Sequence, residues 1–206
     1  MSATEKTVPE KCHACDAELK SPIVCQGCRA LYPLPETVDY FSLLALPRRY
    51  DLDEAALAER FVALSRNVHP DFFTGAGEKM SELATKLSAE LNDAAHVLKD
   101  PVLRAGYLLV TCGGPSAAED RTVPPDVLAA AMLLREEIEE AQAEKKEAEL
   151  DRLRDAIGAA RQKLLDEIAA LARTLPDANS EDKTCLRRAI NSIKYYDNML
   201  ELLWID

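Results

Sequence analysis

Four cysteines near the N-terminus have the residue type and the spacing of a metal site. They form two Cys-x-x-Cys pairs separated by nine residues, Cys12 with Cys15 and Cys25 with Cys28. Each Cys-x-x-Cys turn offers two sulfurs on one side, so two turns can bring four thiolates to the corners of a tetrahedron. Such sulfur sites suit zinc or iron, and a closed set of four leaves no open position for catalysis. The spacing predicts a structural zinc site, with an iron or redox-active site, or His13 in place of one cysteine, as alternatives.

The segment around these cysteines, residues 12–35, is too short to bury a core, so metal binding would supply its folding energy. Only three lysine or arginine residues lie in this segment or directly before it, and no aromatic residue alternates with them: Lys11, Lys20 and Arg29. Protein contact or simple stabilisation is therefore favoured over nucleic-acid binding. The two remaining cysteines, Cys112 and Cys185, stand alone and are expected to be small buried hydrophobes.

His69, Pro70 and Asp71 form a second group with chemical potential. A histidine and an aspartate two residues apart could act as a base and the group that orients it. No nucleophile motif or glycine-rich phosphate loop accompanies them, and Pro70, with φ fixed at about −65°, is expected to hold the two side chains splayed apart. A metal half-site is also disfavoured, because no second ligand pair has suitable spacing. Local physics leaves open a helix end followed by a proline stop and an aspartate turn.

The composition indicates an all-α protein. The chain has 206 residues, 48% of them hydrophobic, with only 7 glycines, and it is rich in the straight-chain residues that favour helices. A net charge of −11 argues against general binding of DNA or RNA. No apolar run approaches the roughly 20 residues that span a bilayer, and residues 1–11 have no targeting pattern and read as a flexible tail. We expect a cytoplasmic protein, or a mitochondrial matrix protein if the source is eukaryotic and a transit peptide is missing.

Apolar periodicity predicts a helical hairpin around the His-Pro-Asp group. A short helix is expected over 39–46, and Asp51 with Glu54 resembles a capping box that opens the next helix. The stripes of the two long helices share a spacing of three or four residues. They consist of Leu57, Phe61, Leu64 and Val68 before the group, and of Met80, Leu83, Leu87, Leu91, Ala94 and Leu98 within 78–99.

Three further helices are predicted after a glycine-rich and proline-rich stretch. Residues 113–124 are expected to be a mobile linker. Helices over 125–147, 150–175 and 181–203 follow, each with an apolar seam at three-four spacing. Seams of this kind are typical of an antiparallel three-helix bundle.

This order of elements resembles the J-domain co-chaperones, and more narrowly the HscB family that serves iron-sulfur cluster assembly. The similarity is carried by "DYFSLLALPRRYDLD", "RFVALSRNVHPDFF", "LNDAAHVLKDPVLRAGYLL" and "LREEIEE". It covers residues 39–206, and the cysteine knuckles look like those of eukaryotic-type members. The resemblance implies a zinc-ribbon-like knuckle over 12–35, a J domain over 36–112, the linker, and a scaffold-binding bundle over 125–206, in an L-shaped arrangement.

The resemblance also implies a function and the residues that carry it. A non-enzymatic co-chaperone would bind a DnaK/HscA-class chaperone, raise its ATP hydrolysis, and deliver an IscU-type scaffold protein through the bundle. The positions that match the chaperone-binding residues are His69, Pro70, Asp71, Arg60 and Arg66. The positions that match the scaffold-binding residues are Leu128, Met132, Glu136, Glu140 and Tyr195. Neither nucleic acid nor a membrane is expected as a partner, and homodimer formation is left open.

Three positions depart from the family pattern. Phe72 stands where many J proteins have lysine, which would weaken the attraction to the chaperone or make it more selective. Ala129 and Leu133 stand where a larger apolar residue and an acid are more frequent, and this would shift the scaffold contact. Leu128 and Met132 have core packing as their alternative role. The alternative for the whole chain is a zinc-ribbon adaptor whose helices serve oligomerisation or a nucleic-acid-associated role.

Overall fold

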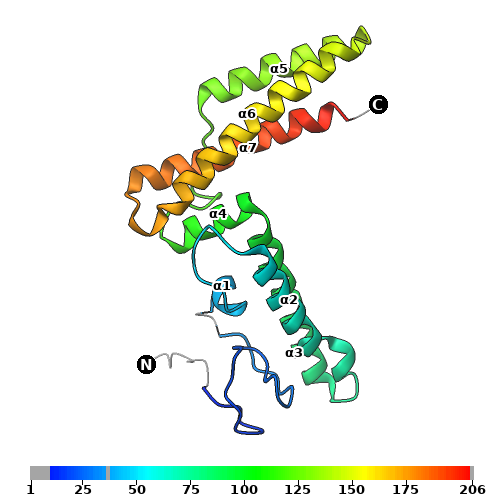
Figure 1. Ribbon diagram of the computed structural model, residues 1–206, viewed down its shortest axis with the longest axis vertical. Coiled ribbons are helices and arrows are strands. Elements are labelled where there is room, and N and C mark those ends of the chain that lie inside the picture. Colours follow the sequence, from blue (N-terminus) through cyan, green and yellow to red (C-terminus); the bar gives the residue numbers. More distant parts are fainter. Residues whose placement is uncertain (1–9, 36–37, 205–206) are drawn as a thin grey trace. The chain divides into compact units, whose positions relative to one another are not determined.

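The computed structural model describes residues 10–35 and 38–204. Within these ranges the regular structure consists of seven α-helices and two short 3-10 segments, with β-pairing limited to the isolated bridges Lys11–Glu18 and Val24–Leu31 (Figure 1). The all-α prediction is therefore confirmed. Most of the expected tail, residues 1–9, lies outside the described residues. None of the described helices is long and apolar enough to cross a membrane.

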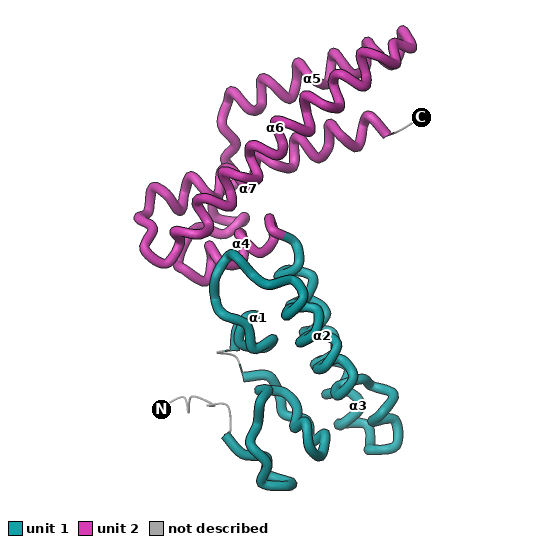
Figure 2. Tube along the Cα trace, viewed as in Figure 1, with its two compact units in different colours: residues 1–100 teal, residues 101–206 magenta. Residues whose placement is uncertain are grey.

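The chain divides into two compact units, residues 1–100 and residues 101–206 (Figure 2). The sequence predicts the end of the J domain at residue 112, whereas this division falls at residue 100. The reason is the packing of helix α4 (Pro101–Thr111), which contacts α6 (Glu147–Arg173) and α7 (Ser180–Leu202). Ala105, Leu108 and Leu109 of α4 are buried.

The first unit contains the predicted hairpin. Helix α1 (Tyr40–Leu43) and the long helices α2 (Glu54–Val68) and α3 (Glu78–Lys99) pack together, and the 3-10 segment η1 (Pro70–Phe73) lies between the long helices. Apolar residues at helical spacing form its core: Leu57, Leu64 and Val68 from α2, and Ala84, Leu87, Leu91, Ala94 and Leu98 from α3. Each large aliphatic side chain that is fully buried stabilises the fold by about 1.5–3 kcal/mol. Of the predicted stripes, Phe61 is only half-buried and Met80 is exposed.

The cap of α2 differs from the prediction. The carboxylate of Asp53, not that of Asp51, accepts hydrogen bonds from the amides of Ala55 (2.9 Å) and Ala56 (3.2 Å). Asp53 directly precedes the first helical residue, Glu54, so its side chain is in register with the unpaired amides. The predicted capping box from Asp51 to Glu54 is therefore wrong by two residues.

The second unit contains the predicted bundle together with α4. Helices α5 (Pro125–Ala143), α6 and α7 contact one another pairwise, and the short segment η2 (Leu175–Asp177) precedes α7. One end of the bundle is closed by buried residues from all three helices and from the turn after α7: Ile138, Ala141, Leu153, Ile157, Met199 and Leu203. The three seams predicted from the sequence therefore do meet in a common core.

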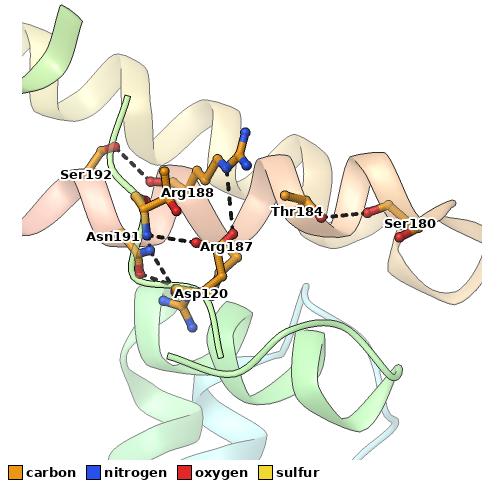
Figure 3. A network of polar contacts seen from close by, with 8 residues as sticks. Asp120, Ser180, Thr184, Arg187, Arg188, Asn191 and Ser192 are labelled. Atoms are coloured by element: carbon orange, nitrogen blue, oxygen red, sulfur yellow. Dashed lines mark hydrogen bonds and ion pairs between the residues drawn. The ribbon is translucent and has the colours of Figure 1, made fainter. Parts of the chain in front are cut away.

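A polar network fastens the linker to α7 (Figure 3). The Asn191 amide donates hydrogen bonds to the carbonyl oxygens of Asp120 (3.1 Å) and Thr122 (3.0 Å), and its oxygen accepts one from Arg187 Nε (3.1 Å). Arg188 faces the Asp120 carboxylate at 3.7 Å, and hydrogen bonds from Thr122 hold the pKa of that carboxyl below its ordinary value. Burial lowers the pKa of the Arg187 guanidinium. The linker that the sequence predicts to be mobile is thus held by specific bonds in its second half.

Candidate functional site

The four predicted cysteine ligands come together in the first unit. Their sulfurs all lie within 4.8 Å of one another, with Cys12 and Cys28 at 3.5 Å and Cys15 and Cys25 at 3.7 Å. Four sulfurs around zinc at about 2.3 Å define a tetrahedron with edges of about 3.8 Å. The donor set therefore fits a tetrahedral metal ion, and its four thiols show that this is a structural metal site.

Two nearly identical turns build this cluster. In each turn the residue after the second cysteine donates its amide hydrogen bond to the carbonyl of the first, Asp16 to Cys12 (2.9 Å) and Arg29 to Cys25 (2.9 Å). Both of these residues have left-handed backbones, with φ of 55° for Asp16 and 60° for Arg29. This conformation costs a residue with a side chain about 1–2 kcal/mol. The ligand geometry imposes it, so metal binding offsets the strain.

Tyr32 contacts the Cys12 ligand, a role that the sequence did not predict. Its buried hydroxyl accepts a hydrogen bond from the His13 amide (3.0 Å) and donates one to the Cys12 sulfur, which lowers the pKa of that thiol to about 6. The Ala17 amide lowers the pKa of Cys15, but hydrogen bonds with the sulfurs of Cys28 and Cys25 outweigh it and raise that pKa to about 12. Cys12 therefore ionises more readily than Cys15.

The structure also places His13 and the two lone cysteines, Cys112 and Cys185. His13 is exposed and packs its ring edge-on against Tyr32 at 5.0 Å, while the metal-ligand groups found in the described residues contain the four cysteines only. Of the lone cysteines, Cys112 is half-buried and Cys185 is exposed, so the prediction of two buried hydrophobes is wrong. Cys185 lies on the solvent face of α7, where helical periodicity turns it away from the core formed by Leu186 and its neighbours.

His69 ends α2 and caps η1. Its Nδ1 accepts a hydrogen bond from the Asp71 amide (3.3 Å), and its carbonyl accepts one from the Phe72 amide (3.1 Å). A neutral imidazole that accepts at Nδ1 carries its proton on Nε2. The Asp71 carboxylate approaches Nδ1 to 3.7 Å, which is too long for a hydrogen bond but closer than the splayed arrangement expected from Pro70.

The side chains of this loop face solvent. The side chain of His69 is 53% exposed and that of Asp71 is 84% exposed. General bases work best in water-excluded sites, so this exposure suits a contact surface better than a catalytic pair. Phe73 is buried and fixes the loop to the hairpin, whereas Phe72 is 57% exposed. Arg60 and Arg66 are exposed on α2.

The predicted scaffold-binding residues of α5 lie on its solvent face. Leu128 is 37% exposed and Met132 is 68% exposed, so most of the Met132 side chain lies outside the core. Leu133, treated in the sequence as a departure, adds a further apolar side chain that is 60% exposed. We call Leu128, Met132 and Leu133 the α5 patch. On the same helix Glu136 and Glu140 are exposed, and on α7 Tyr195 is half-buried.

The comparisons with known proteins agree with this architecture. A family model described as the HSCB C-terminal oligomerisation domain matches residues 123–203. The crystal structure of human co-chaperone protein HscB is similar with a TM-score of 0.76 and 26% identity, covering 94% of this chain and 96% of that chain. The chaperone HscB from Vibrio cholerae is similar with a TM-score of 0.68 and 30% identity, covering 81% of this chain and 96% of that chain. Identity at this level over almost the entire Vibrio protein, joined to the family match in the bundle, means that this chain belongs to the HscB family of J-domain co-chaperones of iron-sulfur cluster assembly.

Proposed function

We propose that this co-chaperone stimulates ATP hydrolysis by a specialised DnaK/HscA-class chaperone and delivers an IscU-type scaffold protein to it. In this proposal residues 36–112 act as the J domain and residues 125–206 as the scaffold-binding bundle. The observation that carries it is the exposed His69-Pro70-Asp71 loop at the end of a well-packed hairpin. The expected location is the cytoplasm, or the mitochondrial matrix for a eukaryotic source.

The loop has the physical properties of a recognition element. Asp71 presents a carboxylate that can form a charge-assisted hydrogen bond with an arginine of the chaperone. Pro70 and the hydrogen bonds of the Asp71 and Phe72 amides to His69 hold the loop in one conformation, which reduces the ordering cost of binding. The exposed guanidinium groups of Arg60 and Arg66 would steer α2 towards an acidic surface.

The α5 patch supports scaffold binding. Exposed apolar side chains that stand together on one helix are typical of protein-protein contacts, and large flexible residues such as Met132 adapt to a partner surface. The acidic side chains of Glu136 and Glu140 on the same helix would give the contact its polar rim. Tyr195 of α7 is assigned to the same contact. Self-association of the bundle would be measured together with scaffold binding, since the matching family model is described as an oligomerisation domain.

We assign zinc to the cysteine cluster. Four thiolates in tetrahedral reach are one of the usual ligand sets of structural zinc, and the site leaves no ligand position for a substrate. In this role zinc supplies folding energy to residues 12–35, whose buried cluster of Cys12, Cys25 and Tyr32 contains two of the four ligands. The cluster then stabilises the knuckle and takes no part in chemistry.

The proposed function is tested by steady-state ATP hydrolysis with a DnaK/HscA-class chaperone and its scaffold protein. Native protein is expected to raise the rate, and His69→Gln to leave it near the basal value, because the substitution removes the Nδ1 acceptor that orders the loop. His96→Gln, an exposed histidine on α3, is the matched control and should behave as native protein. Equal stimulation by native protein and His69→Gln would refute the proposal.

A further inference from the structure

Within the first unit, a cation-π contact joins the metal knuckle, residues 12–35, to the His69-Pro70-Asp71 loop. The guanidinium carbon of Arg29 lies 4.7 Å from the centre of the Phe72 ring. Arg29 directly follows the last metal ligand, Cys28, and Phe72 directly follows Asp71. Two segments with separate roles, 43 residues apart in the chain, therefore meet through one pair of exposed side chains.

The knuckle holds its side of this contact in a fixed place. The amide of Arg29 donates a hydrogen bond to the Cys25 carbonyl (2.9 Å). In return, the Cys25 amide donates one to the carbonyl of Ala30, the residue after Arg29 (2.9 Å). The φ of Arg29 is 60°, a conformation that a glycine would adopt without strain. The position and direction of the Arg29 side chain thus depend on the turn that carries Cys25 and Cys28.

The second partner of the contact, Phe72, also packs its ring against the ring of His69. The ring centres of Phe72 and His69 are 6.2 Å apart with an edge-on angle of 75°. The Phe72 amide donates to the His69 carbonyl (3.1 Å), so ring and backbone move together. Phe72 is 57% exposed, so the core does not hold its ring in place; Arg29 lies over it instead. A restrained Phe72 ring restricts the neighbouring imidazole.

We infer that the metal knuckle positions the His-Pro-Asp loop through Arg29 and Phe72, with Arg29 and Phe72 as positioning residues. Metal loading of the cysteine cluster then sets the order of the loop. The departure of Phe72 from the lysine of many J proteins acquires a role in this way, because lysine at that position would repel Arg29. The consequence for chaperone binding rests on the proposed function, whereas the coupling between knuckle and loop does not.

The coupling is tested by NMR on the full-length, metal-loaded protein without any chaperone. The Arg29 side-chain protons lie over the Phe72 ring, and Phe72→Leu should return their ring-shifted resonances to ordinary positions. Arg29→Gly should raise the exchange rate of the Phe72 amide roughly two- to fivefold, the factor expected for an exposed cation-π contact. Arg29→Lys keeps a cation and should retain most of the protection. Unchanged exchange at Phe72 in Arg29→Gly overturns the inference.

The second turn of the knuckle supplies a matched control. Asp16 occupies the same left-handed position in that turn, with φ of 55°, so Asp16→Gly relieves the same backbone strain as Arg29→Gly. Both variants are expected to fold and to bind metal at least as well as native protein. Only Arg29→Gly should alter the Phe72 amide, and an equal change in Asp16→Gly would show that the effect passes through the knuckle fold rather than through the contact.

Metal removal and the chaperone assay complete the test. Chelation of the metal unfolds a knuckle of this kind. It should therefore raise the exchange rate of the Phe72 amide as much as Arg29→Gly does. Chelation of the Arg29→Gly variant should give no further increase. With the chaperone, Arg29→Gly should raise the half-saturating concentration two- to fivefold at unchanged maximal stimulation. An additive effect of chelation contradicts the coupling. Failure of native protein to stimulate the chaperone counts against the proposed function alone, since the NMR result is independent of it.

Discussion

The metal cluster depends on more residues than its four cysteine ligands, because the Tyr32 hydroxyl acts on Cys12 and Arg29 follows Cys28 in a left-handed conformation. The ligands Cys12, Cys15, Cys25 and Cys28 were identifiable because Cys-x-x-Cys spacing reflects the geometry of one turn. Tyr32 and Arg29 were not, because their roles come from contacts across turns, to Cys12 and to Phe72, that no fixed spacing encodes. Arg29 does have one signal in the sequence, its position directly after a Cys-x-x-Cys turn. The backbone there is left-handed, which favours glycine, so a residue with a side chain at this position indicates a further role.

Tyr32→Phe is expected to weaken metal binding. The substitution removes the hydroxyl that contributes most to lowering the pKa of Cys12 to about 6, so the pKa of this thiol rises and more of it carries a proton that the metal must displace at pH 7. Loss of such a supporting group typically costs 10- to 100-fold in affinity, and we expect about tenfold in competition with a chelator of known affinity. The part of the loss that is due to the proton should shrink as the pH rises past 9, where the Cys12 thiol is ionised in both proteins.

Tyr196→Phe is the matched control for this prediction. Tyr196 is half-buried in the bundle of the second unit, and its substitution should leave metal affinity unchanged. Equal affinity of Tyr32→Phe and native protein at pH 7 would show that the hydroxyl does not assist Cys12.

Elements were predicted well wherever apolar periodicity and burial agree. The hairpin of α2 and α3 and the three bundle helices were found because one face of each helix is buried, which three-four spacing reports directly. The ends were found less well, as the capping residue of α2 shows, because Asp51 and Asp53 both lie before Glu54 and only backbone geometry selects between them. The solvent face of α5 is a different case. Periodicity does not separate the exposed apolar residues of the α5 patch from the buried residues of the same helix, such as Ala131 and Ile138.

Met132→Ala is expected to weaken scaffold binding without affecting the fold. Met132 is 68% exposed, so its removal should change the free energy of unfolding by less than about 0.5 kcal/mol. An apolar side chain at the centre of a protein interface contributes about 1–2 kcal/mol, so the dissociation constant for the scaffold protein should rise roughly 5- to 30-fold by calorimetry. Val110→Ala removes an apolar side chain of α4 that is 47% exposed and should bind as native protein does. Equal weakening by both variants would assign the loss to general surface hydrophobicity.

At the scale of the whole molecule, the sequence predicted the order of the parts but not every attachment. Composition and charge indicated an all-α, acidic protein, and the resemblance indicated the family. The packing of α4 on α6 and α7 has no clear mark in the sequence, because "VLRAGYLLV" is apolar on several sides and its pattern does not select the helices on which it packs. The attachment of the linker was missed because it depends on backbone carbonyl oxygens at Asp120 and Thr122, which have no sequence signature, and on Asn191 some 70 residues further along.

Asn191→Ala tests this attachment. The substitution removes the donor to the linker carbonyls and the acceptor for buried Arg187, and we expect it to lower the free energy of unfolding of the second unit by about 1–2 kcal/mol. Amide protection in α7 should then fall roughly 5- to 30-fold in peptide-level hydrogen exchange. Protection of α2 and α3 should stay unchanged, because the network lies wholly within residues 101–206. Asn198→Ala, an exposed asparagine on the same helix, is the control, and a loss of protection in α7 equal to that of Asn191→Ala would mean that helix propensity rather than the linker bonds explains the effect.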